Sequence, residues 1–253
     1  MARTTEKIRL DKLLVERGLV SSRERAQAII LAGKVLVAGQ KVEKSGVAID
    51  SASEIRLLGE DLKYVSRGGL KLEHALHHWN LDVTRKTCLD VGASTGGFTD
   101  CLLQHGAALV IAVDTGHGQI AFRLRQDSRV HLLEKTNARY LTREQVGEAV
   151  DLIAMDVSFI SATLVLPAVI AASFPEGAEH RRRELIVLVK PQFEAGREYV
   201  GKGGIVKDPE VQLRAVEKVR KCVSELGANE VDVIDSPILG AEGNREFLLR
   251  AQF

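Results

Sequence analysis

Four ionisable side chains lie where the predicted fold brings the chain toward one edge of a sheet. Lys71 stands near the start of a predicted helix, before the first strand of an alternating α/β pattern. Asp156 and Lys190 end two later strands, and Glu246 begins the last one. In open α/β sheets, ligands bind beyond the carboxyl ends of the strands, so we expect the four side chains to meet in one cleft. They would form two ammonium–carboxylate pairs there. The alternative interpretation is two ordinary surface ion pairs.

Two lysines with two acids suit a reaction at an alcohol. A sugar hydroxyl is a very weak acid, and it must be oriented and partly deprotonated when it attacks. Because a lysine in a dry site beside another cation loses its proton more easily, Lys190 is predicted to be the general base. Lys71 would help Lys190 lose that proton and would orient the hydroxyl. Asp156 and Glu246 would hold the two ammonium groups, and most of the catalysis would come from positioning.

The segment CLDVGASTGGFTDCLLQHG at 88–106 places a glycine-rich turn between a predicted strand and a predicted helix. A phosphate-binding P-loop needs lysine after its second glycine, but Phe98 follows Gly97. A dinucleotide turn needs glycine where Ser94 stands. The turn also matches the G-x-S-x-G elbow of α/β-hydrolases, but that triad ends with a late histidine, and the last histidine here is His180.

S-adenosylmethionine fits the turn better. Small residues let the backbone approach the amino-acid end of this cofactor. Asp114, at the end of the second strand, can accept both ribose hydroxyls, and Asn137 follows the third strand, where it can contact adenine. Asp156 would also contact the methionine end. The predicted cofactor residues are Asp90, Gly92, Ala93, Ser94, Thr95, Gly96, Gly97, Phe98, Asp114, Asn137 and Asp156.

Alternating elements position these residues. Strands are predicted at 87–91, 108–113, 129–133, 151–156, 184–190, 230–236 and 246–251, and helices at 67–79, 97–105, 118–126, 142–149, 161–172 and 208–226. The last helix has Asp208 as N-cap, Pro209 in its first turn and Gly227 beyond its end. The pattern predicts an α/β fold with a doubly wound, mostly parallel sheet. No helix separates the last two strands, so we expect an antiparallel hairpin at the sheet edge.

The first 60 residues form a separate unit in this interpretation. Two short helices precede a hairpin at 34–42 and further short strands. The second helix begins at a capping box formed by Ser21 and Glu24. Its apolar side chains Ala26, Ile29 and Ile30 are expected to face inward. Residues 1–63 hold 12 lysines and arginines against 9 acids, whereas the remainder is slightly acidic. A basic helix face can meet phosphates. The residues predicted to bind RNA are Arg9, Lys12, Arg17, Arg23, Arg25, Lys34 and, just beyond this unit, Arg67.

Two resemblances join these observations. RLDKLLVERGLVSSRERAQAIILAGKVLVAGQKV resembles the small RNA-binding domain named after ribosomal protein S4. SRGGLKL, DVGASTGGFTD, MDVSFIS, VLVKPQFE and EGNREFLL resemble the FtsJ-like ribose 2′-O-methyltransferases, with their Lys-Asp-Lys-Glu order. An S4-type head on such a domain resembles the TlyA family, often labelled hemolysin A.

This resemblance implies an α+β RNA-binding domain at 1–60, a linker at 61–66 and a seven-stranded Rossmann-like methyltransferase domain at 67–253, with an antiparallel last strand. It further implies 2′-O-methylation of a cytidine in ribosomal RNA. Longer members of the family modify the RNA of both subunits and shorter members only that of the large subunit. The chain stops at RAQF, directly after its last predicted strand, which favours 23S rRNA in the large subunit. Methylation of both 16S and 23S rRNA, or a non-catalytic role in ribosome assembly, remain the alternatives.

Other classes of protein are less consistent with the sequence. No apolar run is long enough to span a membrane and the N-terminus has no signal-peptide pattern, so we expect a cytoplasmic protein without a pore activity. Three cysteines without C-x-x-C spacing predict buried thiols. His74, His77 and His78 fall in one helical stretch, and we interpret them as an exposed helix face, with no metal centre expected.

Overall fold

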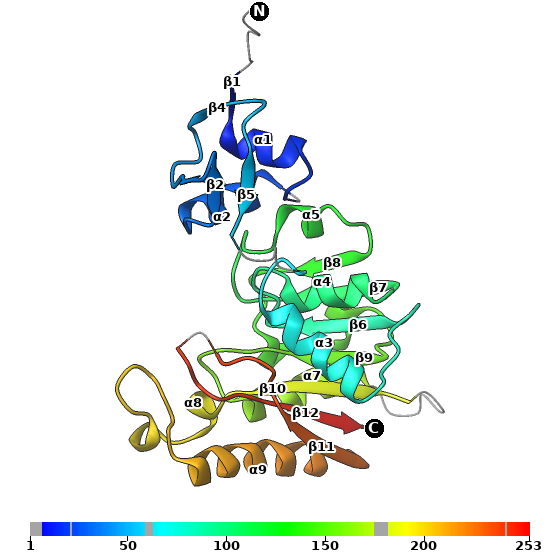
Figure 1. The fold of residues 1–253 in the computed structure, drawn as a ribbon. Helices are drawn as coiled ribbons and strands as arrows, with labels where there is room; N and C mark the ends of the chain where they lie inside the picture. The colour runs from blue at the N-terminus through cyan, green and yellow to red at the C-terminus, as the bar shows by residue number, and fades with distance from the viewer. Residues whose placement is uncertain (1–6, 21, 59–62, 175–181, 241) are drawn as a thin grey trace, which may run out of the picture. The chain divides into compact units, whose positions relative to one another are not determined.

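The computed structural model describes residues 7–20, 22–58, 63–174, 182–240 and 242–253. The chain divides into two compact units, Met1–Leu62 and Lys63–Phe253. The described part of the second unit contains a seven-stranded sheet (Figure 1). Its strands are β6 (Thr87–Val91), β7 (Leu109–Val113), β8 (Val130–Leu133), β9 (Leu152–Met155), β10 (Glu184–Val189), β11 (Glu230–Asp235) and β12 (Phe247–Gln252).

The strand order confirms the predicted doubly wound topology. The order is β11-β12-β10-β9-β6-β7-β8, and the central pairs from β10 to β8 are parallel. Only β12, among the described strands of this sheet, runs antiparallel to its neighbours β10 and β11. The direct connection from β11 to β12, which lacks a helix, produces this reversal. The carboxyl ends of β6, β7, β9 and β10 therefore face the same edge.

Helices pack on both faces of the sheet. Successive side chains of a buried parallel strand point to opposite faces, so both faces are apolar and need a covering layer. Leu89 packs in a core with Leu166 and Val219, whereas the adjacent Cys88 packs in a second core with Leu72. The helices of this unit are α3 (Gly68–His78), α4 (Gly97–Gln104), α5 (Phe122–Arg125), α6 (Arg143–Val146), α7 (Leu166–Ser173), α8 (Pro191–Glu194) and α9 (Pro209–Glu225), with 3₁₀ turns η1 (Ala138–Tyr140), η2 (Ala162–Leu164) and η3 (Arg197–Tyr199).

Three helix predictions were wrong in length or type. The helix predicted at 118–126 is only the single turn α5, because carboxylates hold the preceding backbone: Gly116 N–H donates to Asp114, and Gly118 N–H donates to Glu134. The helix predicted at 142–149 ends at Val146, because Gly147 adopts a φ of 73°. The one predicted at 161–172 begins as the 3₁₀ turn η2 before α7.

The first unit is a small α+β domain, as predicted. Its elements are β1 (Lys7–Arg9), α1 (Leu10–Glu16), α2 (Arg23–Leu31), β2 (Val35–Val37), β3 (Gln40–Lys41), β4 (Ala48–Asp50) and β5 (Ile55–Leu57). Strands β2 and β3 form the predicted hairpin, whose two-residue turn, Ala38-Gly39, has positive φ at both positions, as a type I′ turn requires.

The core of the first unit lies between its helices and its strands. Ala26, Ile29 and Ile30 are buried there, as predicted. The predicted cap Ser21 lies outside the described residues. The N-cap of α2 is Ser22, one residue later, and its side chain accepts a hydrogen bond from the backbone N–H of Arg25.

Candidate active site

The turn after β6 folds tightly against two neighbouring strands. The backbone N–H groups of Gly92 and Ala93 both donate to the carbonyl of Val113, over 2.9 and 3.1 Å. Gly92 has a φ of 89°, and a Cβ there would lie 2.3 Å from the backbone oxygen of Asp156. Glycine is therefore required at this position. Ser94 also has positive φ, which turns its backbone N–H toward Asp114.

Asp90 anchors the helix that follows the turn. Its fully buried carboxylate accepts hydrogen bonds from both the backbone N–H and the hydroxyl of Thr99, at 2.9 and 2.6 Å. Burial, with the charges of Asp156 and Asp114, raises the pKa of Asp90 to about 7 despite these bonds. Asp90 does not line either of the cavities described below, so in this structure it supports the turn from behind.

A cavity of about 510 Å³ opens between the turn and the ends of β7, β8 and β9. Asp114 lies in its wall, where one carboxylate oxygen accepts from Ser94 N–H at 2.8 Å and the other from Gly116 N–H at 2.6 Å. Asn137 also lines this cavity, and its side-chain oxygen caps η1 by accepting from Arg139 N–H. Backbone bonds thus hold both side chains in place while they face the cavity.

A smaller cavity of about 300 Å³ contains all four of the predicted catalytic residues. The ammonium of Lys190 lies 2.5 Å from a carboxylate oxygen of Asp156, and the ammonium of Lys71 lies 2.5 Å from a carboxylate oxygen of Glu246. Lys71, Lys190 and Glu246 are buried, each less than 10% exposed. The alternative of surface ion pairs is therefore wrong. The partners come from α3, the ends of β9 and β10, and the start of β12.

The two cavities adjoin, because Gly92, Ser94 and Asp156 line both. Every predicted cofactor residue except Asp90 and Gly96 lines one cavity or the other. A Cβ at Gly96 would lie 2.3 Å from Leu124, so this glycine permits close packing beneath the turn. A ligand in the larger cavity could thus present one end to the ion pairs in the smaller one.

Sequence reasoning missed one contact of Lys190, the hydroxyl of Ser158. The Lys190 ammonium donates to the Ser158 hydroxyl at 2.8 Å, a contact that the MDVSFIS motif gave no reason to expect. Phe159 is 91% exposed in the wall of the larger cavity. Its φ is 64°, and its ring packs 5.4 Å from that of Phe193. A large exposed aromatic ring in a left-handed backbone conformation is unusual away from functional sites.

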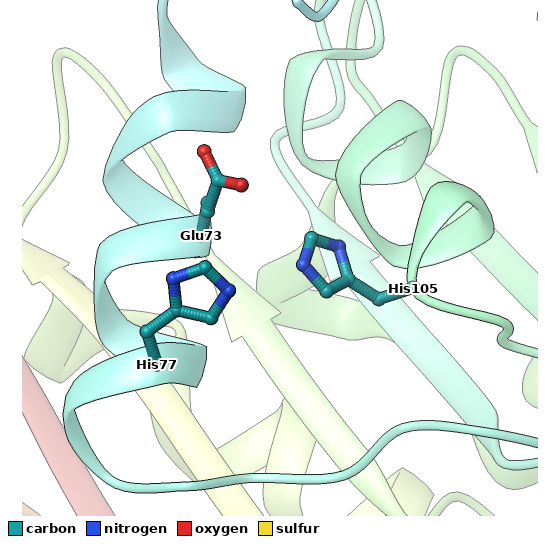
Figure 2. A group of neighbouring side chains, drawn as sticks. All are labelled: Glu73, His77 and His105. Atoms are coloured by element: carbon teal, nitrogen blue, oxygen red, sulfur yellow. The ribbon is translucent and has the colours of Figure 1, made fainter.

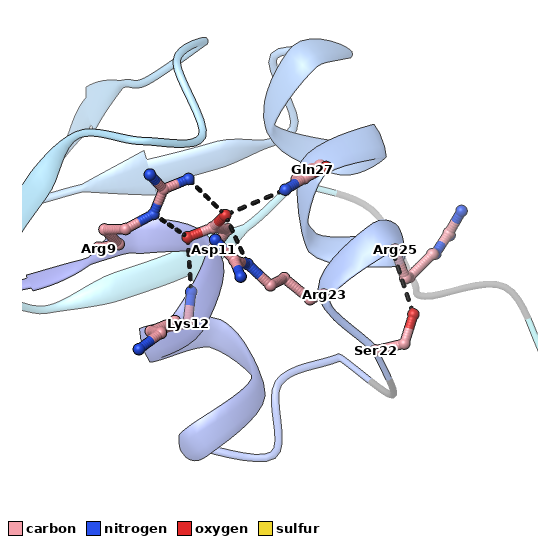
Figure 3. Close-up of polar contacts among 7 residues, drawn as sticks. All are labelled: Arg9, Asp11, Lys12, Ser22, Arg23, Arg25 and Gln27. Atoms are coloured by element: carbon pink, nitrogen blue, oxygen red, sulfur yellow. Dashed lines mark hydrogen bonds and ion pairs between the residues drawn. The ribbon is translucent and has the colours of Figure 1, made fainter. Parts of the chain in front are cut away.

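In the first unit, one buried carboxylate organises two of the predicted RNA-binding residues. Asp11 is fully buried and accepts hydrogen bonds from the guanidinium groups of Arg9 and Arg23 and from Gln27 (Figure 3). The bond from Arg9 is the main reason why the pKa of Asp11 lies far below its usual range. Arg9 and Arg23 remain about half exposed, so their outer faces stay accessible.

The remaining predicted RNA contacts are spread more widely. Lys12, Arg17 and Lys34 are exposed in the first unit, and Arg25 is half-buried. Arg17 donates to the backbone carbonyls of Ser51 and Ser53, which fixes its guanidinium. Arg67 is not part of this unit and lies in the wall of the smaller cavity. In the predicted linker, Tyr64 is buried in the core of the second unit, and Val65 N–H donates to Asp100.

The sheet order, the glycine-rich turn after the internal strand β6 and the paired cavities at the carboxyl edge are those of a methyltransferase. Comparison with known families agrees. Residues 64–253 match the FtsJ-like methyltransferase family, and residues 8–55 match the S4 domain. The chain therefore belongs to the FtsJ-like methyltransferase family and carries an N-terminal S4 domain.

Comparison with individual proteins identifies relatives that match most of the chain. The chain is 45% identical to the 16S/23S rRNA (cytidine-2′-O)-methyltransferase TlyA of Mycobacterium tuberculosis, covering 95% of this chain and 88% of that protein. It is 36% identical to the 23S rRNA (cytidine-2′-O)-methyltransferase TlyA of Campylobacter jejuni, covering 80% of this chain and 73% of that protein. A solved structure of a candidate hemolysin from Streptococcus thermophilus matches with a TM-score of 0.71 and 42% identity, covering 98% of this chain and 89% of that one.

The hemolysin name raises the question of membrane insertion. Within the described ranges, no helix combines the length and the apolar character needed to cross a membrane.

Proposed function

We propose that this protein transfers a methyl group from S-adenosylmethionine to the ribose 2′-hydroxyl of a cytidine in ribosomal RNA, with 23S rRNA as the substrate. The observation that carries the proposal is the pair of buried ammonium–carboxylate contacts beside the larger cavity. Four charges in so small a space are costly to desolvate, and their joint presence argues against a purely RNA-binding role.

The residues around the larger cavity suit S-adenosylmethionine. The carboxylate of Asp114 is held by two backbone N–H groups and keeps acceptor capacity for a pair of ribose hydroxyls. The turn at Gly92 and Ala93 brings backbone close to the cavity shared with Asp156, where a small amino-acid group fits. When bound, this cofactor supplies an electrophilic methyl group on a sulfonium.

In the smaller cavity we assign Lys190 as the general base. The Lys190 ammonium would first give up a proton, which the positive charge of Lys71 in the same cavity favours, and its neutral amine would then take the proton of the attacking 2′-oxygen while the bound cofactor supplies the methyl group. Asp156 and Ser158 lie in contact with the Lys190 nitrogen and stabilise the ammonium formed in this step. Lys71, fixed by Glu246, orients the hydroxyl.

An oxygen acceptor fits this site better than a base nitrogen. Methyltransferases that act on base amino groups use an Asn-Pro-Pro-Tyr type motif after the fourth strand, and Asp156-Val157-Ser158-Phe159 stands there instead. Among the described residues that line the two cavities, there is neither histidine nor cysteine, so lysine is the strongest base available. We assign Phe159, exposed in the wall of the larger cavity, to stack on the target base.

Three observations support ribosomal RNA as the substrate. The S4 match covers the basic first unit, the two TlyA relatives are both named for rRNA, and both names include 23S. Because the M. tuberculosis relative is also named for 16S rRNA, modification of both rRNAs is the second candidate. An rRNA substrate would also place the reaction in the cytoplasm.

The test is methyl transfer to unmodified 50S and 30S subunits from methyl-labelled S-adenosylmethionine, with Lys190→Ala as control. Nuclease digestion followed by mass spectrometry identifies the product nucleoside. The proposal requires 2′-O-methylcytidine in 23S rRNA that is absent with Lys190→Ala. Label in both 16S and 23S rRNA would favour the second candidate. Label on a base, or none in either rRNA while the cofactor still binds, would refute the proposal.

A further inference from the structure

Outside the two cavities, three possible metal ligands converge between α3 and the end of α4. Glu73 and His77 are four residues apart on α3 and therefore project from adjacent turns of one helix face. His105 follows the last residue of α4. One donor atom from each residue lies within 4.8 Å of the other two. Figure 2 shows the carboxylate and both imidazole rings turned into the same space.

The hydrogen bond of His105 selects the tautomer that a metal requires. Its Nδ1 lies 2.8 Å from the backbone carbonyl of Cys101, which can only accept, so Nδ1 carries the proton. In the neutral ring the other nitrogen, Nε2, then presents a lone pair, and it faces α3 (Figure 2). A histidine oriented by a backbone carbonyl in this way is typical of metal ligands. Neighbouring His77 lies with its ring centre 5.8 Å from that of His105.

Glu73 is half-buried and has an exchangeable partner. Lys63 forms an ion pair with Glu73, but its own side chain is about half exposed. A divalent ion can therefore replace Lys63 without leaving a buried ammonium without a partner.

From this arrangement we infer a binding site for a zinc-class divalent ion formed by Glu73, His77 and His105. Two imidazoles and one carboxylate are a donor set that Zn²⁺ binds at about 2.0–2.2 Å, with one position left for water. Side-chain rotation is enough to bring the donor atoms to that spacing, because His77 is exposed and Lys63 can move away.

The ion would act by holding two helices together. Helix α3 carries Lys71, and α4 begins at Gly97 and Phe98, in the wall of the smaller cavity. None of the three ligands lines either cavity, so the ion takes no part in methyl transfer. It would tie the far ends of these helices and so stabilise the frame that holds Lys71 and the cofactor turn. This inference is independent of the proposed reaction.

The experiment is calorimetric titration of ZnCl₂ into metal-free, tag-free full-length protein, with Co²⁺ substitution read by its visible absorption. We expect one ion per chain, a four-coordinate cobalt spectrum and a higher melting temperature. His77→Ala, at an exposed position with little folding cost, and His105→Asn should each weaken binding by at least the ~10–100-fold that loss of an outer-shell partner costs. Lys63→Met, which removes the competing cation, should tighten it several-fold.

The matched control is the double variant His74→Asn/His78→Asn. These two exposed histidines are also four residues apart on α3, with ring centres 6.3 Å apart, and offer only two ligands. The control should bind Zn²⁺ as tightly as the wild type. Binding that is lost in this control but kept in His77→Ala and His105→Asn would overturn the inference, as would the absence of zinc binding in the wild type.

Discussion

The two units use carboxylates in opposite ways. In the smaller cavity, Asp156 and Glu246 each hold one buried lysine, so that both cations are withdrawn from water; Glu246 is itself buried, whereas the Asp156 side chain is 22% exposed. In the first unit, the single buried carboxylate of Asp11 gathers Arg9 and Arg23, which remain about half exposed. The first arrangement suits proton transfer in a dry site, and the second suits recognition of phosphate at a surface.

The largest effect should come from breaking a buried pair. Glu246→Gln leaves the Lys71 ammonium without its partner and should lower the free energy of unfolding by about 3 kcal/mol. The double variant Lys71→Met/Glu246→Gln should recover most of this stability but not methyl transfer. Chemical denaturation provides the measurement. Glu225→Gln, which breaks the exposed Lys221–Glu225 pair, is the control and should change stability by only about 0.5 kcal/mol. Equal losses of stability in Glu246→Gln and Glu225→Gln would contradict the expected difference between a buried and an exposed ion pair.

A second effect concerns Phe159, the exposed ring in the wall of the larger cavity. Phe159→Ala should reduce transfer at subsaturating RNA by about tenfold or more, because stacking on one base contributes ~1–3 kcal/mol. Binding of S-adenosylmethionine should change little. Phe122→Ala, at another exposed phenylalanine outside both cavities, provides the comparison. If the two variants behave alike, Phe159 has no special role.

In the first unit, Asp11→Asn should weaken RNA binding by about tenfold, since two arginines lose their fixed orientation and each ordered side chain costs ~0.5–1.5 kcal/mol. Both arginines keep their charge, so the salt dependence of binding should stay nearly constant. Arg9→Ala/Arg23→Ala should reduce that dependence as well. Filter binding over a range of salt concentrations separates these cases, with Glu54→Gln as an exposed control. Unchanged affinity in Asp11→Asn would show that the network is only structural.

The smallest change in free energy, counted per pH unit, is a pH dependence of stability from Asp90. Its folded-state pKa of about 7 lies above the unfolded value near 4, so the folded protein binds the extra proton between these values. Stability from this group is therefore present at low pH and falls, by up to about 1.4 kcal/mol per pH unit, as pH rises toward 7. Unfolding of the wild type and Asp90→Asn should thus converge in acid and diverge toward neutral pH. If the stabilities of the wild type and Asp90→Asn changed in parallel with pH, a raised pKa of Asp90 would be excluded.

Local signals in the sequence were enough to predict most of the fold. Asp208, Pro209 and Gly227 mark the ends of α9, and the structure places that helix at Pro209–Glu225. Local signals failed where distant groups hold the backbone. The Glu134 carboxylate accepts a hydrogen bond from Gly118 N–H and helps to keep the chain before α5 out of a helix. This contact could not be predicted from the residues near 118 in the sequence.

In the candidate site, too, local signals were predictable and contacts between distant residues were not. The positions of Asp156, Lys190 and Glu246 could be predicted because each lies beside a strand whose apolar run is easily recognised, and that of Lys71 because it lies near the start of a recognisable helix before the first strand. Asp11 looked like an ordinary helix residue, because Gln27 and Arg23 reach it only in the folded domain. Likewise, His105 meets His77 across two helices, whereas the sequence had grouped His77 with His74 and His78.

The central claim is that Lys190 acts as a base in methyl transfer rather than only as a charge. Single-turnover transfer and calorimetric cofactor binding should be measured in parallel for Lys190→Ala and Lys190→Arg. Since arginine keeps the charge but cannot lose its proton, both variants should bind S-adenosylmethionine normally and lose about 10²–10⁴-fold in transfer rate. Near-normal transfer by Lys190→Arg would contradict the account, and so would loss of cofactor binding in both variants.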